Sequence, residues 1–169
     1  ATMAYSGDAR TRAASDPTAH RVLHALPPYA YRSPFGPGTD AECGVRAAEH
    51  VEQLITREGA HEVAAVLMEV DSGTNGLVPP DSYWPEIQKI CRHYGILLIA
   101  DEVVCGFGRL GRWFGCEHFG FEPDFMTLAK AITSGYQPLG AVMVADRVAE
   151  VLIGQGGEFH HGYTYSGHP

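Results

Sequence analysis

A carboxylate and an amine follow two apolar runs in the middle of the chain. Asp101 comes directly after the run Ile96–Ala100, and Lys130 comes directly after the run Phe125–Ala129. Both runs are short and rich in aliphatic residues, which is typical of buried strands in a parallel sheet. Ligands of open α/β sheets bind at the carboxyl ends of the strands, so we expect Asp101 and Lys130 to face one crevice.

The two side chains supply complementary chemistry. A lysine amine can form a Schiff base with a carbonyl compound and, once released, can act as general base and acid. A carboxylate beside a heterocyclic nitrogen keeps that nitrogen protonated, so that the ring withdraws electrons from a carbanion. These are the two protein groups that pyridoxal phosphate chemistry needs most. On spacing alone, an acid at a strand end is also commonly an ordinary exposed residue or a helix cap.

Two helices are expected before this region. Thr39 and Glu42 have the spacing of a capping box, and apolar residues at helical spacing follow as far as Gly59, a plausible helix end. A second helix is expected between Ser82, which would cap it, and Gly95. The first helix is interpreted as a packing element without a chemical role.

Further strands complete an α/β order. The run 63–68 predicts a buried strand that ends before Glu69, and with the following helix and the run at 96–100 it forms a right-handed βαβ unit. Another strand is expected over 141–145, followed by a short helix over 146–153. The segment 1–38 has little periodicity; its first fourteen residues could hold a short helix or strand, and residues 26–38 are expected to be a surface loop.

Composition limits the classes of function. The chain has 169 residues, enough for one domain with a core, and 12 basic against 20 acidic residues give a formal charge of −8. This charge argues against nucleic acid or an anionic membrane as the main partner. The sequence has neither a long apolar run nor a cleavable signal, and its four cysteines lack CxxC spacing, so we expect a cytoplasmic protein with reduced thiols.

Three other patterns are weaker candidates for sites. The histidine clusters at 116–118 and 158–161 lack the spacing of a structural zinc site, so no metal is expected. The glycines of 106–111 imitate a dinucleotide fingerprint, but the acid precedes them and no helical run is evident after Gly111. Thr164 and its neighbours could offer hydroxyls to a phosphate, although their composition is also typical of a turn.

Taken together, these residues resemble a known family. The ordered motifs that carry the resemblance are Ala100-Asp101-Glu102-Val103, Gly106-Phe107-Gly108-Arg109, Phe114-Gly115, Pro123-Asp124, Leu128-Ala129-Lys130 and the tail His161–Pro169. They are similar to the class III pyridoxal phosphate aminotransferases, from about residue 64 to the end of the chain. Within that family, Val103-Val104-Cys105-Gly106 and the tail look most like the ω-amine and diamine:pyruvate branch.

The resemblance implies roles for individual residues. Asp101 would pair with the pyridine nitrogen of the cofactor, pyridoxal 5'-phosphate, and Val103 would pack on one face of its ring. Lys130 would hold the cofactor aldehyde as a Schiff base. Thr164 would reach the phosphate, usually that of the neighbouring subunit, which implies a homodimer or homotetramer with shared active sites. Glu69 matches the family and would have a supporting role.

Two departures from the family pattern accompany the match. The chain has Val104 where many members have a glutamine that would bond the ring hydroxyl. After Glu69 it reads Val70-Asp71-Ser72-Gly73-Thr74-Asn75-Gly76 in place of a proline and a loop of small residues. Asp71 and the bulkier residues of this loop could narrow or recharge the substrate side.

The resulting expectation is an α/β fragment, residues 1–169, from the central part of the large domain of a fold type I pyridoxal-phosphate-dependent transferase. Its sheet would be mostly parallel with flanking helices, and both ends of the parent chain would be missing. The expected activity is ping-pong transfer of an amino group from an ω-amino acid, amine or diamine to a keto acid such as pyruvate. Alternatives are an acetylornithine-type aminotransferase, a 2,1-aminomutase, or a non-catalytic fragment that keeps the fold and the dimer surface.

Overall fold

A computed structural model describes residues 5–7, 22–162 and 164. The chain divides into two compact units. The first unit comprises residues 1–64 and 74–96, and the second comprises residues 65–73 and 97–169. In the described part of the chain, no helix is both long enough and apolar enough to cross a membrane.

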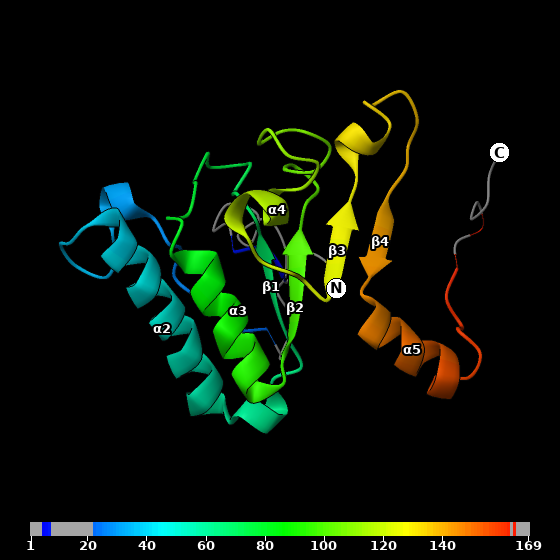
Figure 1. Cartoon of the computed structure of the whole chain (residues 1–169), viewed down its shortest axis with the longest axis horizontal. Helices are drawn as coiled ribbons and strands as arrows, with labels where there is room; N and C mark the ends of the chain where they lie inside the picture. The colour runs from blue at the N-terminus through cyan, green and yellow to red at the C-terminus, as the bar shows by residue number, and fades with distance from the viewer. Residues whose placement is uncertain (1–4, 8–21, 163, 165–169) are drawn as a thin grey trace. The chain divides into compact units, whose positions relative to one another are not determined.

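Two helices dominate the first unit and lie side by side, α2 (Asp40–Glu58) and α3 (Tyr83–Tyr94) (Figure 1). The predicted capping box of α2 is confirmed, because Thr39 Oγ1 accepts the Glu42 N–H at 3.3 Å and a Glu42 carboxylate oxygen accepts the Thr39 N–H at 2.7 Å. Gly59 ends α2 with a φ of +92°, a value that L side chains rarely adopt. Short 3₁₀ turns, η2 (Ala30–Arg32) and η3 (Ala60–Glu62), flank the helix.

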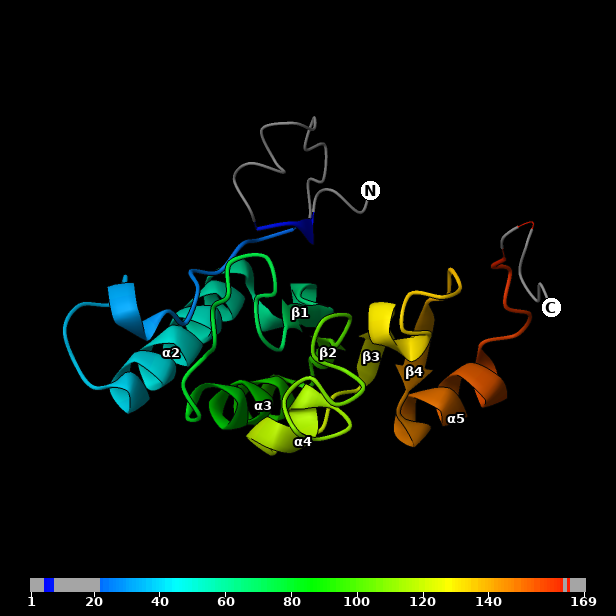
Figure 2. The same cartoon turned by 90° about the horizontal axis from the view of Figure 1, so that it is seen from above.

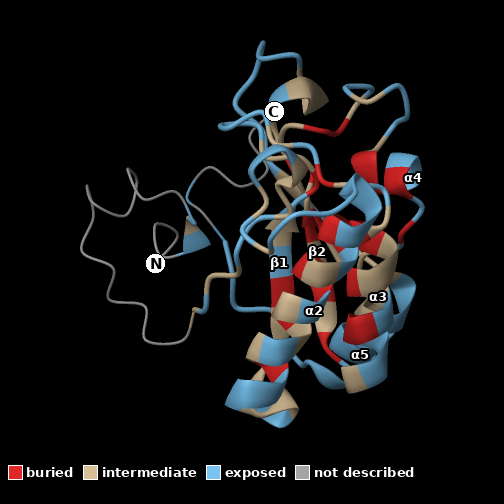
Figure 3. Cartoon of the chain, turned by 90° about the vertical axis from the view of Figure 1, so that its left-hand side faces the viewer, coloured by how far each residue is buried: buried red, intermediate tan, exposed pale blue. Residues whose placement is uncertain are grey.

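The prediction that Ser82 caps α3 with its side chain is wrong. Ser82 has helical backbone angles, and its hydroxyl instead donates a hydrogen bond of 2.8 Å to the Ala41 carbonyl at the start of α2. Ser82 therefore ties the two helices together. Trp84 in the first turn of α3 is fully buried, and Figure 3 shows buried residues on both helices.

The second unit is built on a four-stranded sheet in the order β1-β2-β3-β4. Strands β1 (Ala65–Glu69), β2 (Leu97–Asp101) and β3 (Phe125–Leu128) are parallel, and β4 (Ala141–Val144) is antiparallel to β3. Figure 1 shows the arrowheads of β2 and β3 pointing the same way and that of β4 pointing back. The predicted mostly parallel sheet is confirmed, with strand ends displaced by one or two residues.

Alternating burial distinguishes the two faces of this sheet. Leu98, Ala100, Met126 and Leu128 are buried on one face, as alternation along each strand requires. On the other face, a cross-strand row of four residues in register lies at or next to the carboxyl ends of the parallel strands, namely Glu69, Asp101, Thr127 and Val142. The face with the buried residues thus supplies the packing, while Glu69, Asp101 and Thr127 supply polar groups on the other face.

Two helices belong to the second unit, α4 (Gly115–Phe119) and α5 (Asp146–Gln155). Sequence periodicity missed α4, because five residues are too few to show a repeat. The chain between β2 and α4 runs as a looped excursion, which Figure 2 shows from above. The four cysteines are all buried and free, as expected of reduced thiols.

Candidate active site

Asp101 is the last residue of β2 and is only partly buried. Its Oδ1 accepts the Val103 N–H at 2.9 Å, a turn-like bond that fixes the carboxylate relative to its own backbone. Its Oδ2 has no hydrogen bond to another described residue. One oxygen is thus used for orientation, and the other is available to a ligand.

Lys130 lies at the carboxyl end of the neighbouring strand, as the first residue of the 3₁₀ turn η4 (Lys130–Ile132). The lysine is exposed, and its amine forms no hydrogen bond or ion pair with the residues that the structure describes. Its φ is +48°, in the left-handed region that non-glycine residues rarely occupy. Such a conformation costs on the order of 1–3 kcal/mol and is found mostly where function requires it.

The sheet brings the two predicted residues to one edge. Asp101 pairs in register with Thr127 of β3. Lys130 comes shortly after Thr127, just beyond the end of β3. Thr127 Oγ1 is buried and has no hydrogen-bond partner among the described residues. A buried hydroxyl without a partner is costly, and so its place beside Asp101 points to a ligand group at this edge.

Glu102 is a residue of this edge to which the sequence interpretation gave no role. It is fully buried, with 0% exposure, and its two carboxylate oxygens accept the backbone N–H groups of Gly115 at 2.9 Å and Cys116 at 2.7 Å. The Cys116 thiol is a further partner. Burial raises the pKa of Glu102, these donors oppose that rise, and the nearby Asp101 charge adds to it. A charged residue immediately after an apolar strand was the available signal.

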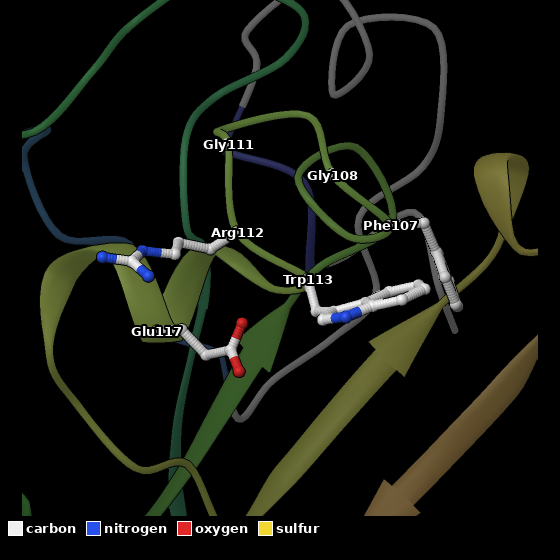
Figure 4. Close-up of a pocket in the computed structure, with 6 residues that line it drawn as sticks. All are labelled: Phe107, Gly108, Gly111, Arg112, Trp113 and Glu117. Atoms are coloured by element: carbon white, nitrogen blue, oxygen red, sulfur yellow. The ribbon is translucent and has the colours of Figure 1, made fainter.

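The loop after β2 closes on itself. The Phe107 N–H donates to the Trp113 carbonyl at 2.6 Å, and Phe107 has a φ of +62°. Residues of this loop and Glu117 of α4 line a pocket of about 820 Å³, and Figure 4 shows the lining residues Phe107, Gly108, Gly111, Arg112, Trp113 and Glu117. Asp101 and Lys130 do not line this pocket. The candidate cofactor groups therefore lie elsewhere on the same edge.

The unusual loop after β1 also reaches this edge. Burial raises the pKa of the Asp71 carboxyl, which a His118 charge would oppose. Asp71 Oδ1 is buried without a hydrogen-bond partner in the described part of the chain. Gly73 packs so closely on Val104 that an added Cβ would lie 2.6 Å from a Val104 methyl. The two departures from the family pattern are therefore in contact with each other.

The remaining predicted residues lie as follows. Val103 is partly buried and immediately follows the Asp101-Glu102 pair. Thr164 is exposed in a turn of the carboxy-terminal tail. No contact in the described structure joins Thr164 to Asp101 or Lys130, so the chain brings together only three of its four predicted residues.

The residues at this edge fit pyridoxal phosphate. Within the described part of the chain, Asp101 Oδ2 and the Lys130 amine have no partner, so the first can accept a pyridinium N–H and the second can take an aldehyde, while Val103 offers an apolar surface. The Thr127 hydroxyl, which has no hydrogen-bond partner among the residues that the structure describes, lies in register with Asp101 and leaves a polar group for a ligand. The acid ends β2, the apolar side chain follows shortly after it, and the amine follows the adjacent parallel strand β3.

Comparison with known proteins gives a consistent family. The family model "Aminotransferase class-III" matches residues 1–169. A putrescine–pyruvate aminotransferase of Pseudomonas aeruginosa is 52% identical over 152 residues, which are 88% of this chain and 32% of that protein. A diaminobutyrate–2-oxoglutarate transaminase of Halomonas elongata is 49% identical over 153 residues, 87% of this chain and 33% of the relative. The chain thus spans about a third of the length of these relatives.

Solved structures agree with the sequence matches. An (S)-enantioselective ω-transaminase from Thermomicrobium roseum aligns with a TM-score of 0.79 and 49% identity, over 85% of this chain and 32% of that one. An ω-transaminase from Pseudomonas jessenii, solved in complex with PMP, aligns with a TM-score of 0.92 and 38% identity, over 98% of this chain and 37% of that one. The fold of this chain is therefore that of part of an ω-transaminase.

Proposed function

Because this chain belongs to the class III aminotransferases, we propose that the complete protein is a pyridoxal-phosphate-dependent transaminase. It moves an amino group from an ω-amino acid, an amine or a diamine to a keto acid such as pyruvate, by a ping-pong route. The observation that carries this proposal is that the Lys130 amine, which has no partner among the described residues, lies on the same sheet edge as the Asp101 carboxylate, whose Oδ2 accepts no hydrogen bond from them. Residues 1–169 form part of the large, cofactor-binding domain of that protein.

Each proposed site residue has one task. Bound pyridoxal phosphate supplies an aldehyde and an electron-withdrawing ring. Asp101 Oδ2 keeps a proton on the ring nitrogen, because a carboxylate beside the N–H favours its charged form. Lys130 Nζ anchors the aldehyde and then carries a proton as general base and acid. Val103 covers an apolar ring face and excludes water from it.

Relatives support the donor class. The named donors putrescine, γ-aminobutyrate and diaminobutyrate share a terminal primary amine. Among these relatives, the putrescine–pyruvate enzyme has 52% identity to this chain. We therefore assign a diamine or ω-amino acid as donor and pyruvate as acceptor, with 2-oxoglutarate as the alternative acceptor to be assayed beside it.

The assembly is proposed to be a homodimer or homotetramer with shared active sites. Thr164 is exposed and makes no described contact with the Asp101–Lys130 edge, which is consistent with a role at the phosphate of a neighbouring subunit. Light scattering of the complete polypeptide tests this, since a monomer at micromolar concentration would contradict it. The four free, buried cysteines are consistent with a reducing compartment, and we propose the cytoplasm.

Covalent trapping tests the activity. The complete natural polypeptide is incubated with pyridoxal phosphate, reduced with borohydride and mapped by peptide mass. We expect a phosphopyridoxyl adduct on Lys130 that Lys130→Ala abolishes, while Lys89→Ala, which removes an exposed lysine of α3, retains it. A folded wild-type protein without the Lys130 adduct would overturn the proposal.

A further inference from the structure

Glu102 has an environment unlike that of its neighbour Asp101. Successive residues of a strand point to opposite faces, so Glu102 enters the buried side of the sheet while Asp101 lies in the polar row. The Glu102 N–H continues the sheet ladder by donating to the Thr127 carbonyl at 3.0 Å. The backbone between the two carboxylates is therefore fixed, and holding one side chain fixes the direction of the other.

The Glu102 side chain joins the end of β2 to the start of α4. Its two oxygens take the Gly115 and Cys116 N–H groups, and its own carbonyl accepts the Gly106 N–H at 2.8 Å. The chain between these anchors is the loop that begins with Val103. No side chain could replace hydrogen at Gly115 without a shift, because an added Cβ would lie 2.8 Å from Val70 and 3.1 Å from Glu102 Oε2.

The cost of this arrangement argues for a purpose beyond capping. A fully buried carboxylate carries a large desolvation penalty, whereas a helix of five residues gains little by itself from a cap. The bonds from Gly115 and Cys116 offset that penalty only while the whole loop is in place. The element that they stabilise contains Val103, and it starts at the Val103 N–H that orients Asp101.

We propose that Glu102 is a positioning residue for the cofactor: its carboxylate holds the loop from Val103 to Phe114 in the conformation that directs Asp101 and Val103 toward pyridoxal phosphate. Glu102 does not touch the cofactor. This inference rests on the proposed function and deepens it, because it assigns the cofactor affinity of the site to a residue on the opposite face of the sheet.

The test compares two buried acids of the same sheet. Glu102→Gln keeps the size of the side chain but places an amide N–H₂ against a backbone N–H. The matched control is Asp124→Asn, because Asp124 is also buried and also accepts a backbone N–H, that of Leu98 at 2.8 Å, at the amino end of β2. The dissociation constant of pyridoxal phosphate is measured by absorbance titration of each apoprotein, together with the melting temperature and the visible circular dichroism of bound cofactor.

We expect Glu102→Gln to raise the dissociation constant at least about tenfold, because a hydrogen bond to a charged group is lost, and to change the circular dichroism. Asp124→Asn should lower the melting temperature and leave the dissociation constant within about twofold of wild type. Equal changes in both variants, or an unchanged constant in Glu102→Gln, would overturn the inference.

A second variant covers the case in which Glu102→Gln does not fold. Glu102→Asp keeps the charge on a shorter stem, and we expect its dissociation constant to lie above that of wild type with a melting temperature close to it. A wild-type constant in Glu102→Asp together with an unfolded Glu102→Gln would overturn the inference. Absence of the borohydride adduct in wild type would instead contradict the proposed function, so the two failures are distinguishable.

Discussion

The carboxyl and amino edges of one sheet hold their charges in opposite ways. At the amino edge, Asp124 accepts the Leu98 N–H through one oxygen and pairs through the other with Arg147, and its backbone N–H and carbonyl bond to Leu98 and Ala145. At the carboxyl edge, Asp101 keeps an oxygen free and Lys130 has no partner among the described residues. The same fold thus satisfies its charges at one edge and leaves them available at the other.

Strain follows the same division. The non-glycine residues with positive φ in the described chain are Phe107, Lys130 and Ser134, and all follow the carboxyl ends of strands. Two buried side-chain atoms have no hydrogen-bond partner in the described part of the chain, Asp71 Oδ1 and Thr127 Oγ1, and both lie at that edge too. Strained residues and unpaired buried polar groups persist where the surrounding structure holds them in place for function. In the described chain, these destabilising features gather at the carboxyl edge of the sheet.

The largest expected effect is on turnover at the carboxyl edge. Asp101→Asn preserves an oxygen for the Val103 N–H but removes the negative charge. We expect kcat with a diamine and pyruvate to fall at least about 100-fold in the complete polypeptide, because a preorganised charge is lost. Steady-state kinetics measure this. A kcat within about threefold of wild type would contradict the contrast between the two edges, because Asp101 would then have no role in turnover.

At the amino edge, the expected effect is on stability rather than on turnover. Asp124→Ala removes the acceptor of the Leu98 N–H and the partner of Arg147. We expect the free energy of unfolding to fall by about 1–3 kcal/mol, because a buried backbone donor is left without a partner and Arg147 loses its ion pair with Asp124. Urea titration measures the change, with Arg147→Ala as the control that leaves the Leu98 bond in place and costs less. Equal losses in the two variants would contradict this assignment.

The contrast between the edges also explains what could be predicted from sequence. Apolar runs and their following charges predicted the strands that end at Asp101 and before Lys130, because burial in a parallel sheet leaves a local pattern. The capping box at Thr39 is equally local. The roles of Asp101, Val103, Lys130 and Thr164 were assigned by family resemblance and stay predictions.

Long-range contacts could not be predicted in this way. Glu102 bonds to Gly115 and Cys116 across a loop, and Asp124 pairs with Arg147 of α5. Ser82 donates its hydroxyl proton to the distant Ala41 carbonyl instead of accepting a backbone N–H of its own helix. No spacing rule along the chain marks such partners, and α4 itself is too short for periodicity to reveal.

A loss of stability of similar size is expected where the two family departures meet. Gly73→Ala would place a Cβ 2.6 Å and 2.9 Å from the two methyl groups of Val104, a stiff β-branched side chain. We expect a loss of about 1–3 kcal/mol in the free energy of unfolding, as in other overpacked sites. The double variant Gly73→Ala/Val104→Ala should recover at least half of it. A double variant no more stable than Gly73→Ala would show that the clash lies with the backbone instead.

The smallest effect is a pH dependence that belongs to the carboxyl edge. Burial raises the pKa of Glu102 above its ordinary value of 4.5, so the folded protein holds this proton more tightly than the unfolded chain does. At a pH between the pKa of Glu102 in the unfolded chain and its pKa in the folded protein, the native state binds more protons than the unfolded state does. The contribution of Glu102 to the free energy of unfolding therefore increases as pH falls through the native pKa. It levels off below the pKa of the unfolded chain.

Glu102→Gln removes this titration while leaving every other acid in place. Urea unfolding of wild type and Glu102→Gln from about pH 7 to about pH 4 should therefore give a stability difference that shifts in favour of wild type as pH falls. The Asp71 carboxyl, whose pKa is also raised by burial, contributes equally to both proteins and cancels in the difference. A constant difference, or one that shifts toward the variant, would mean that the hydrogen bonds from Gly115 and Cys116 outweigh the burial of Glu102. The carboxyl edge would then be as fully compensated as the amino edge, and the contrast between them would reduce to Asp101 and Lys130.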